Sequence, residues 1–191
     1  VEVDLHRGKP QLIIIGLANQ AVTESKERIT AALLNCNITP KSKRTVVNLA
    51  PADIKKSGTS FDLAITLALL NAYGTITYDL KQVMIFGELS LDGNIKKVRG
   101  IIPLLIHAKQ QGYSSVIIPQ ENQHEVSLLT DMNIYPVSHL RQLLSVKNIQ
   151  ELKTLSVSDA PQTEDLVFAN TFEEIYEQQE AKRALEIAAA G

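Results

Sequence analysis

The segment Phe61–Tyr73 is apolar on nearly every side of a helix, and Gly74 follows it at once. A helix without a polar face has to be covered by the rest of the protein, and glycine suits the left-handed position that ends a helix. The segment therefore predicts a buried helix. The chain has 191 residues, of which 45% are apolar, and this is enough for one domain with a proper core.

After Gly74, strands and helices alternate, an order that is typical of α/β layers. The hydrophobic periodicity predicts the following strands: residues 1–5 and 11–15, joined as a hairpin, then 45–49, then 82–91, which turns at Asp92-Gly93 into 94–98, then 115–118 and 133–137. The predicted helices are 20–35 capped by Asn19, the buried helix 61–73, then 100–111, 120–129, and 139–144 capped by Ser138.

The helix 20–35 is predicted to bury one face and to carry charges on the other. Glu24 and Arg28 are four residues apart, a spacing that favours an ion pair on the exposed face. The apolar face consists of Val22, Ile29, Leu33 and Cys36. Cys36 is the single cysteine, so the chain cannot form an internal disulfide, and we expect an ordinary core residue there.

The net charge of −2 excludes only a uniformly basic nucleic-acid binder. No apolar run approaches the roughly 20 residues of a membrane-spanning helix, and no charged-then-apolar leader is present. We therefore expect a cytoplasmic chain with no membrane contact.

Towards its end the chain changes composition. Residues 156–164 are rich in Ser, Asp, Pro, Gln and Thr, which is typical of a linker. We predict a domain at 1–150, a linker at 151–166 and the start of a second unit at 167–191. A helix from about Phe172 to Ala190 cannot bury its own surface, so we expect the chain to be part of a longer polypeptide.

Three segments stand out when taken in this order: Asn48–Asp53 with the following Phe61-Asp62-Leu63, then Gly87–Gly93, and then Gln179–Gly191. Together they resemble the ComM/YifB family of magnesium-chelatase-related AAA+ ATPases. In that family the third segment leads directly into the Walker A loop. The sequence departs from the family at Glu177-Gln178, where a Gly-Gln pair is usual.

The resemblance implies an amino-terminal domain with the Lon-protease-like fold, also called ribosomal-S5-domain-2-like, followed by a hexameric AAA+ motor that uses ATP and Mg²⁺. It also implies a role in DNA branch migration during natural transformation. The chain itself has no phosphate-binding loop of the form Gly, four residues, Gly-Lys-Ser/Thr. We therefore expect no cofactor in this chain, and self-association into a hexamer and DNA as the partners of the full-length protein.

Ser60, in Gly58-Thr59-Ser60-Phe61-Asp62, takes the position of the nucleophile of Lon peptidases. A serine needs a base to remove its proton. Counting without gaps from Gly87-Glu88, the position of the Lon lysine falls on Ile102. Since isoleucine takes no proton, we predict no catalytic residue and no enzyme in this chain, and we expect Ser60 to cap the buried helix instead.

Metal binding is not predicted. The four histidines are scattered, and none in a predicted helix is four residues from another ligand.

Three basic clusters lie in or beside loops. If the loops converge, they would offer a patch for DNA phosphates or for a neighbouring subunit, and if they do not, they are solvated loops. The sequence has no tryptophan, which argues against stacking of single-stranded bases. The clusters are Lys41, Lys43 and Arg44; Lys55 and Lys56; and Lys96, Lys97 and Arg99.

Three functions remain open. The first is a non-catalytic domain of a DNA-handling AAA+ motor. The second is a Lon-like peptidase with an unusual base, and Ile102 speaks against it. The third is a chelatase-type accessory module that remodels a protein client, which the residues alone do not separate from the first.

Overall fold

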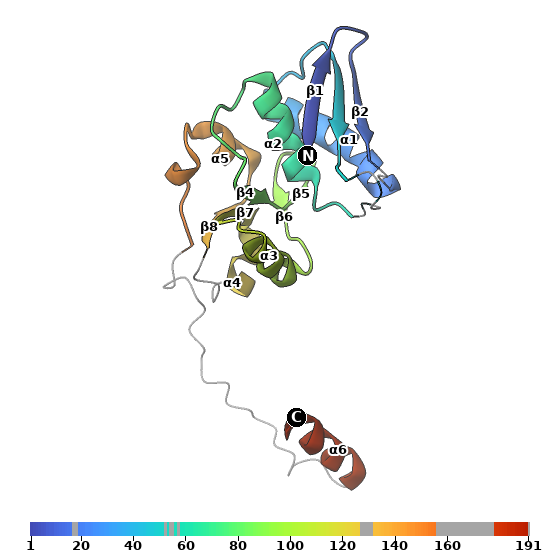
Figure 1. Cartoon of the computed structure of the whole chain (residues 1–191), viewed down its shortest axis with the longest axis vertical. Coiled ribbons are helices and arrows are strands. Elements are labelled where there is room, and N and C mark those ends of the chain that lie inside the picture. The colour runs from blue at the N-terminus through green and yellow to red at the C-terminus, as the bar shows by residue number, and fades with distance from the viewer. Residues whose placement is uncertain are drawn as a thin grey trace. The chain divides into compact units, whose positions relative to one another are not determined.

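Strand β3 (Arg44–Asn48) lies at the centre of a three-stranded sheet in the computed structural model (Figure 1). It pairs antiparallel with β1 (Glu2–His6) on one side and parallel with β2 (Gln11–Ile15) on the other. The hairpin predicted for the first two strands is therefore wrong as a pairing. β3 enters between them, and its Thr45-Val46-Val47 run of β-branched residues suits a strand that is hydrogen-bonded along both edges.

The structure describes residues 1–16, 19–51, 53, 56, 58–126, 132–155 and 178–190. The chain divides into two compact units, Val1–Ala160 and Pro161–Gly191. In the second unit the described element is helix α6 (Gln179–Ala190). The predicted linker core 156–164 and the predicted helix start at Phe172 lie outside the described residues, so the division into a domain, a linker and a second unit stays a prediction.

Helix α1 (Gln20–Asn35) has the predicted bounds and the predicted cap, since the Asn19 side chain accepts a hydrogen bond from the Val22 amide at 3.0 Å. Its apolar face packs against one face of the sheet, where Val3, Leu5, Leu12 and Ile14 flank the buried β3 residues. The predicted apolar face is confirmed, because Val22, Ile29, Leu33 and Cys36 are all buried.

Helix α2 (Asp62–Tyr73) is the buried helix that the sequence predicts, and Gly74 ends it in the left-handed conformation with φ 72°. Its buried residues join those of α1 and of the three-stranded sheet in one hydrophobic core. Because α2 is apolar almost all round, it can contact α1, β1 and β5 at once.

The second sheet is parallel throughout and has the order β4 (Val83–Ile85), β7 (Ser115–Pro119), β8 (Asn133–Val137). Parallel strands need crossover connections, and here helices supply them. These are α3 (Ile101–Gln110) before β7, and the 3₁₀ turn η1 (Gln120–Asn122) with α4 (Gln123–Val126) before β8. Helix α5 (Leu140–Ser145) follows β8. A short 3₁₀ turn, η2 (Ile149–Glu151), follows. The α/β class expected from the sequence is confirmed.

The predicted strand 82–91 is in fact two strands, because the chain leaves the second sheet at Gly87. β5 (Glu88–Leu89) and β6 (Ile95–Lys96) then form the predicted hairpin by themselves. The Gly87 amide donates to the Ser60 carbonyl at 3.1 Å, and the Leu63 amide donates to the Gly87 carbonyl at 3.0 Å. A Cβ at Gly87 would lie 3.0 Å from the side chains of both Leu63 and Ile95, so only glycine lets the backbone approach α2 this closely.

The cap of α5 also differs from the prediction. His139 occupies the N-cap position, and its Nδ1 accepts from the Arg141 amide at 3.1 Å. Gln142 completes the capping box by accepting from the His139 amide at 3.1 Å, and it accepts from the Ser138 amide at 2.7 Å as well. Ser138 is therefore a partner of the capping box and not the cap.

No helix in the described ranges is both long enough and apolar enough to cross a membrane.

Candidate functional site

Ser60 lies in the loop that enters α2, at the position where Lon-like peptidases place their nucleophile. The helix begins at Asp62 with Phe61 as the N-cap residue, and no side chain accepts a hydrogen bond from the amides of its first turn. The expected capping role of Ser60 is therefore wrong. The helix begins one residue later than predicted, so Ser60 precedes the N-cap position.

Neighbouring side chains hold this loop against the β5–β6 hairpin. The Thr59 hydroxyl donates to a carboxylate oxygen of Glu88 on β5. Together with the two backbone bonds to Gly87, this contact ties Gly58–Leu63 to the segment Gly87–Leu89, which is the second of the segments that carried the family resemblance.

Asp62 is the most completely enclosed charged group among the described residues, with 0% exposure. Its Oδ2 accepts from Arg28 Nε at 2.8 Å and from the Leu89 amide at 3.3 Å. Its Oδ1 accepts from Arg28 Nη2 at 3.1 Å and from the Ser25 hydroxyl. The predicted pair of Arg28 with Glu24 is replaced by this buried pair. The reason is that packing of α2 against α1 brings the Asp62 carboxylate within hydrogen-bonding distance of the Arg28 guanidinium.

The electrostatics of the pair follow from this geometry. The hydrogen bonds that Arg28 donates to Asp62 raise the pKa of the Arg28 guanidinium above its usual range, although partial burial acts in the opposite direction. A buried carboxylate is tolerable only when it is paired and hydrogen-bonded, and here four donors surround it. The four donors belong to Ser25 and Arg28 on α1 and to Leu89 on β5, so Asp62 links α2 to both elements. Because its carboxylate oxygens already accept these hydrogen bonds, Asp62 is not a free base for Ser60.

Ile102, which the count along the sequence predicts to stand at the position of the Lon lysine, lies in the first turn of α3 and is 40% exposed. Its side chain is a hydrocarbon, so it has no proton-accepting group. In the described part of the chain no basic side chain is hydrogen-bonded to the Ser60 hydroxyl. The arrangement contains a serine at the expected place and no described partner that would activate it.

The three basic clusters differ in their exposure and in their hydrogen-bond and ion-pair partners. Lys96 lies 4.0 Å from a Glu121 carboxylate oxygen, and Lys97 forms an ion pair with Glu125. Lys56 is buried, and its ammonium donates to the Pro51 carbonyl. Lys55 lies outside the described residues, and Arg99 is exposed.

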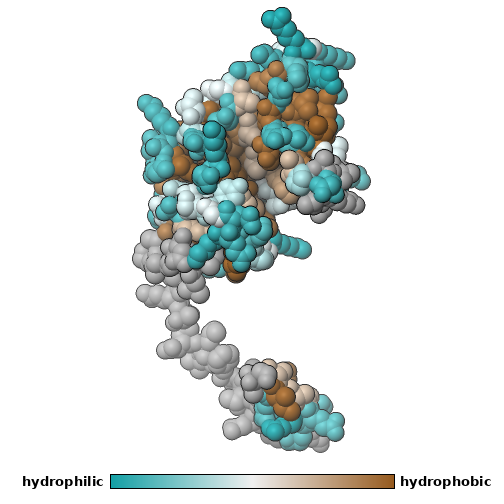
Figure 2. Space-filling model, viewed as in Figure 1, coloured by the Kyte–Doolittle hydropathy of each residue, from teal (hydrophilic) through white to brown (hydrophobic). Residues whose placement is uncertain are grey.

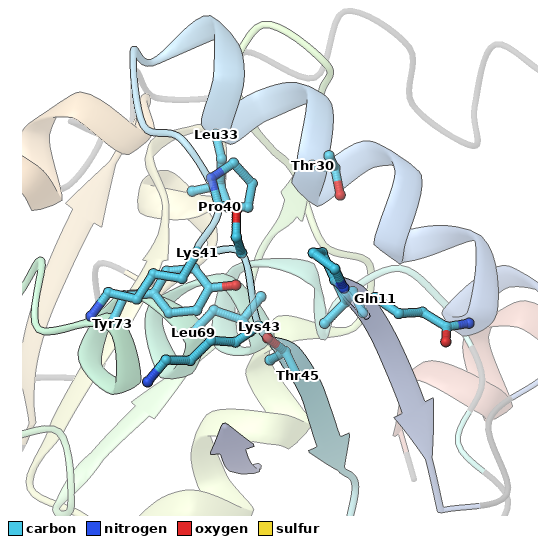
Figure 3. Close-up of a pocket in the computed structure, with 12 residues that line it drawn as sticks. Gln11, Thr30, Leu33, Pro40, Lys41, Lys43, Thr45, Leu69 and Tyr73 are labelled. Carbon is cyan, nitrogen blue, oxygen red and sulfur yellow. The ribbon is translucent and has the colours of Figure 1, made fainter. Parts of the chain in front are cut away.

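The cluster Lys41, Lys43 and Arg44 is exposed. Lys41 and Lys43 border a pocket of about 220 Å³ between α1, α2 and the three-stranded sheet (Figure 3). Leu33, Leu69 and Thr45 form its buried wall. Lys41 lies along the ring of Tyr73, with its ammonium nitrogen 5.9 Å from the ring centroid. All three charged side chains of this cluster are exposed to solvent.

Sequence reasoning did not single out Ser25, Arg28 and Asp62 as a network. The signal was an aspartate at the start of an otherwise apolar buried helix, since such a charge requires a partner. Reasoning from sequence also missed Arg7 and Lys9, whose position beside the Lys41–Arg44 segment depends on strand pairing.

Metal ligands do not gather in the described part of the chain, where no group of three or more His, Cys, Asp or Glu residues could hold an ion.

The chain matches the family model described as subunit ChlI of Mg-chelatase over residues 1–122. It is 37% identical to competence protein ComM of Haemophilus influenzae over 195 aligned residues, which cover 100% of this chain and 38% of that protein. It is 31% identical to the protein YifB of Escherichia coli K12, with 100% of this chain and 37% of that protein covered.

A more distant similarity concerns Lon proteases. Lon protease 2 of Bacillus subtilis is 30% identical over 128 residues, which cover 67% of this chain and 21% of that protein. This partial match agrees with the Lon-like fold that the family resemblance implied.

The ComM and YifB relatives match from one end of the chain to the other, whereas the Lon match is partial. The chain spans about 38% of the length of the ComM relative. The family model covers well over half of the chain, and the chain belongs to the magnesium-chelatase ChlI family, in the group that contains ComM and YifB.

Proposed function

We propose that the chain is the non-catalytic amino-terminal domain of a longer AAA+ ATPase that moves DNA strands, as in branch migration during natural transformation or recombination. The observation that carries the proposal is its similarity over the whole chain to competence protein ComM, of which it spans 38%. The motor that binds ATP and Mg²⁺ would lie in the remainder, since this chain has no phosphate-binding loop. We place the protein in the cytoplasm and the working assembly in a hexamer.

The geometry around Ser60 supports a non-catalytic role for this domain. The neighbouring carboxylate of Asp62 is held by Arg28, and Ile102 stands where a lysine would be needed. In this proposal the Ser60 loop corresponds to the nucleophile loop of Lon-like peptidases, while Asp62, the first residue of α2, is buried and joins α2 to α1 through Arg28.

Two alternatives have an observation in their favour. Similarity to Lon protease 2 favours a peptidase, but Ser60 has no base among the side chains that the structure describes. The ChlI description favours a chelatase-type module that remodels a protein client. The name of the whole-chain relative ComM favours the DNA role over the client-remodelling role.

The proposal is tested by measuring ATP hydrolysis and displacement of a labelled strand from a branched duplex, with the 191-residue chain and with the longer polypeptide that contains it. The longer protein is expected to hydrolyse ATP and to displace the strand, and the chain alone to do neither. ATP hydrolysis that neither responds to DNA nor moves a strand contradicts the DNA role.

A serine-directed fluorophosphonate probe tests the peptidase alternative separately. No labelling of Ser60 is expected, and stoichiometric labelling at this residue would overturn the non-catalytic assignment.

A further inference from the structure

The pairing of the three-stranded sheet brings two basic segments to the same end of it. Arg44 is opposite His6 on β1 and opposite Gln11 on β2, so the β1–β2 turn and the loop before β3 end side by side. The Gln11 amide donates to the Lys43 carbonyl at 3.4 Å, and a Cβ on Gly8 would lie 3.6 Å from the Cβ of Arg44. The resulting basic tip consists of Arg7, Lys9, Lys41, Lys43 and Arg44.

The charges of the basic tip are not neutralised within the described part of the chain. All five residues are exposed, and none of their nitrogens lies within 4.0 Å of a described carboxylate oxygen. Asp4, which is on the adjoining strand, faces His6 at 3.4 Å. Figure 2 shows hydrophilic side chains projecting at the end of the molecule where these segments lie.

Five uncompensated cations on one tip stand out in a chain whose net charge is −2. Like charges held close together repel one another, and a bound polyanion relieves that repulsion. Among the other described basic side chains that the sequence singled out, Lys96 and Lys97 have glutamate partners and Lys56 is buried. Arg99 is exposed but lies outside the basic tip.

We propose that the basic tip binds the phosphodiester backbone of duplex DNA. The inference rests on the proposed DNA-handling function and assigns a contact surface to it. Arginine and lysine side chains on turns offer charges without a pattern for reading bases, and such charges bind phosphates.

The composition of the tip selects duplex backbone over two other polyanions. Binding of single strands uses exposed aromatic rings. Tyr73, the aromatic residue that Lys41 contacts, is only 8% exposed, and the Lys41 ammonium lies over its ring. Binding to an anionic membrane surface uses apolar side chains beside the cations. The segments His6–Pro10 and Lys41–Arg44 contain no large aliphatic residue.

The test is the affinity of the 191-residue chain for a short fluorescein-labelled duplex, measured by anisotropy between about 50 and 200 mM salt. The variant Arg7→Gln/Lys43→Gln removes two tip charges. Log affinity falls with log salt, and each lost phosphate contact makes this negative slope shallower by about 0.9, so its magnitude is expected to decrease by about 1.8. At the low-salt end this corresponds to a loss of affinity on the order of 100-fold.

The matched control is Lys96→Gln/Lys97→Gln, which removes the same charge from the paired cluster and is expected to keep the affinity within about twofold. Thermal unfolding of both variants checks that the fold is retained. Equal weakening by the two variants, which would reflect net charge alone, overturns the proposal, and so does unchanged binding by the tip variant.

Two further outcomes also count against the basic tip. No binding of the unmodified chain to the duplex at low salt overturns the proposal. Binding to phosphatidylserine-containing vesicles without binding to the duplex assigns the tip to membranes and overturns it too. Strand displacement by the longer protein is a separate measurement, so the tip can fail while the proposed motor function stands, and the reverse.

Discussion

Arg28 Nε lies 2.8 Å from Asp62 Oδ2, and this contact joins the middle of α1 to the first residue of α2 across 34 positions of sequence. The carboxylate is fully buried and the Arg28 side chain is 21% exposed. Asp62 follows the loop of Ser60 directly and also accepts a hydrogen bond from the Leu89 amide on β5. The contact with Arg28 therefore helps to hold this loop in place between α1 and β5.

Replacing Arg28 with Met is expected to destabilise the fold by about 3 kcal/mol, because it leaves the Asp62 carboxylate buried without its cation. Urea unfolding followed by circular dichroism measures the change. Glu24→Gln, at the partner that sequence spacing favours, is the control and is expected to change stability by less than about 0.5 kcal/mol. The double variant Arg28→Met/Asp62→Asn should cost less than the sum of its single changes, and additive costs would contradict the coupling.

Ser60→Ala is expected to change the free energy of unfolding by less than about 0.5 kcal/mol, because the hydroxyl caps no amide of α2. Asn19→Ala removes the cap of α1 and should cost about 1 kcal/mol. The two variants are compared by thermal melting under the same conditions. A loss at Ser60 as large as the loss at Asn19 would restore the capping role.

Gly93→Ala is expected to destabilise by about 2–4 kcal/mol. Its φ is 91°, and an added Cβ would lie 2.8 Å from Cys36 Sγ and 3.0 Å from His139 Cε1. Gly74→Ala has a similar φ of 72° but meets nothing within 4 Å, so it isolates the backbone strain and should cost about 1 kcal/mol. Equal losses at the two glycines would show that the contact with Cys36 and His139 adds nothing.

Tyr78 should make stability depend on alkaline pH. Burial raises the pKa of its phenol from 10.0 to about 12, and the hydroxyl donates to the Leu143 carbonyl at 2.9 Å. The unfolded chain therefore releases this proton first, so the contribution of Tyr78 is complete below pH 10.0 and is lost as the pH rises to about 12.

The loss assigned to Tyr78 is on the order of 2 kcal/mol across that interval. Urea unfolding of the native chain and of Tyr78→Phe at a series of pH values measures it. The variant is expected to be less stable at neutral pH, since it lacks the hydrogen bond, and to lose less stability at high pH. Parallel curves for the two proteins would contradict the assignment.

Local interactions account for what the sequence determined by itself. The Asn19 cap, the apolar face of α1 and the Gly74 end of α2 all depend on residues within about one or two helical turns. The positions of β7 and β8 were also predicted from the sequence. For β7 the reason is its continuous apolar run, which favours a buried parallel strand. The family relationship was likewise carried by short segments that can be read without the fold.

Tertiary structure alone decided the features that link distant residues. β3 separates β1 from β2, since a central strand gains hydrogen bonds along both edges that a hairpin would not supply. Arg28 pairs with Asp62 because a buried carboxylate needs a cation more than an exposed glutamate does. The basic tip also depends on tertiary structure. The register that places Arg44 opposite both His6 and Gln11 is set by backbone pairing along the whole sheet.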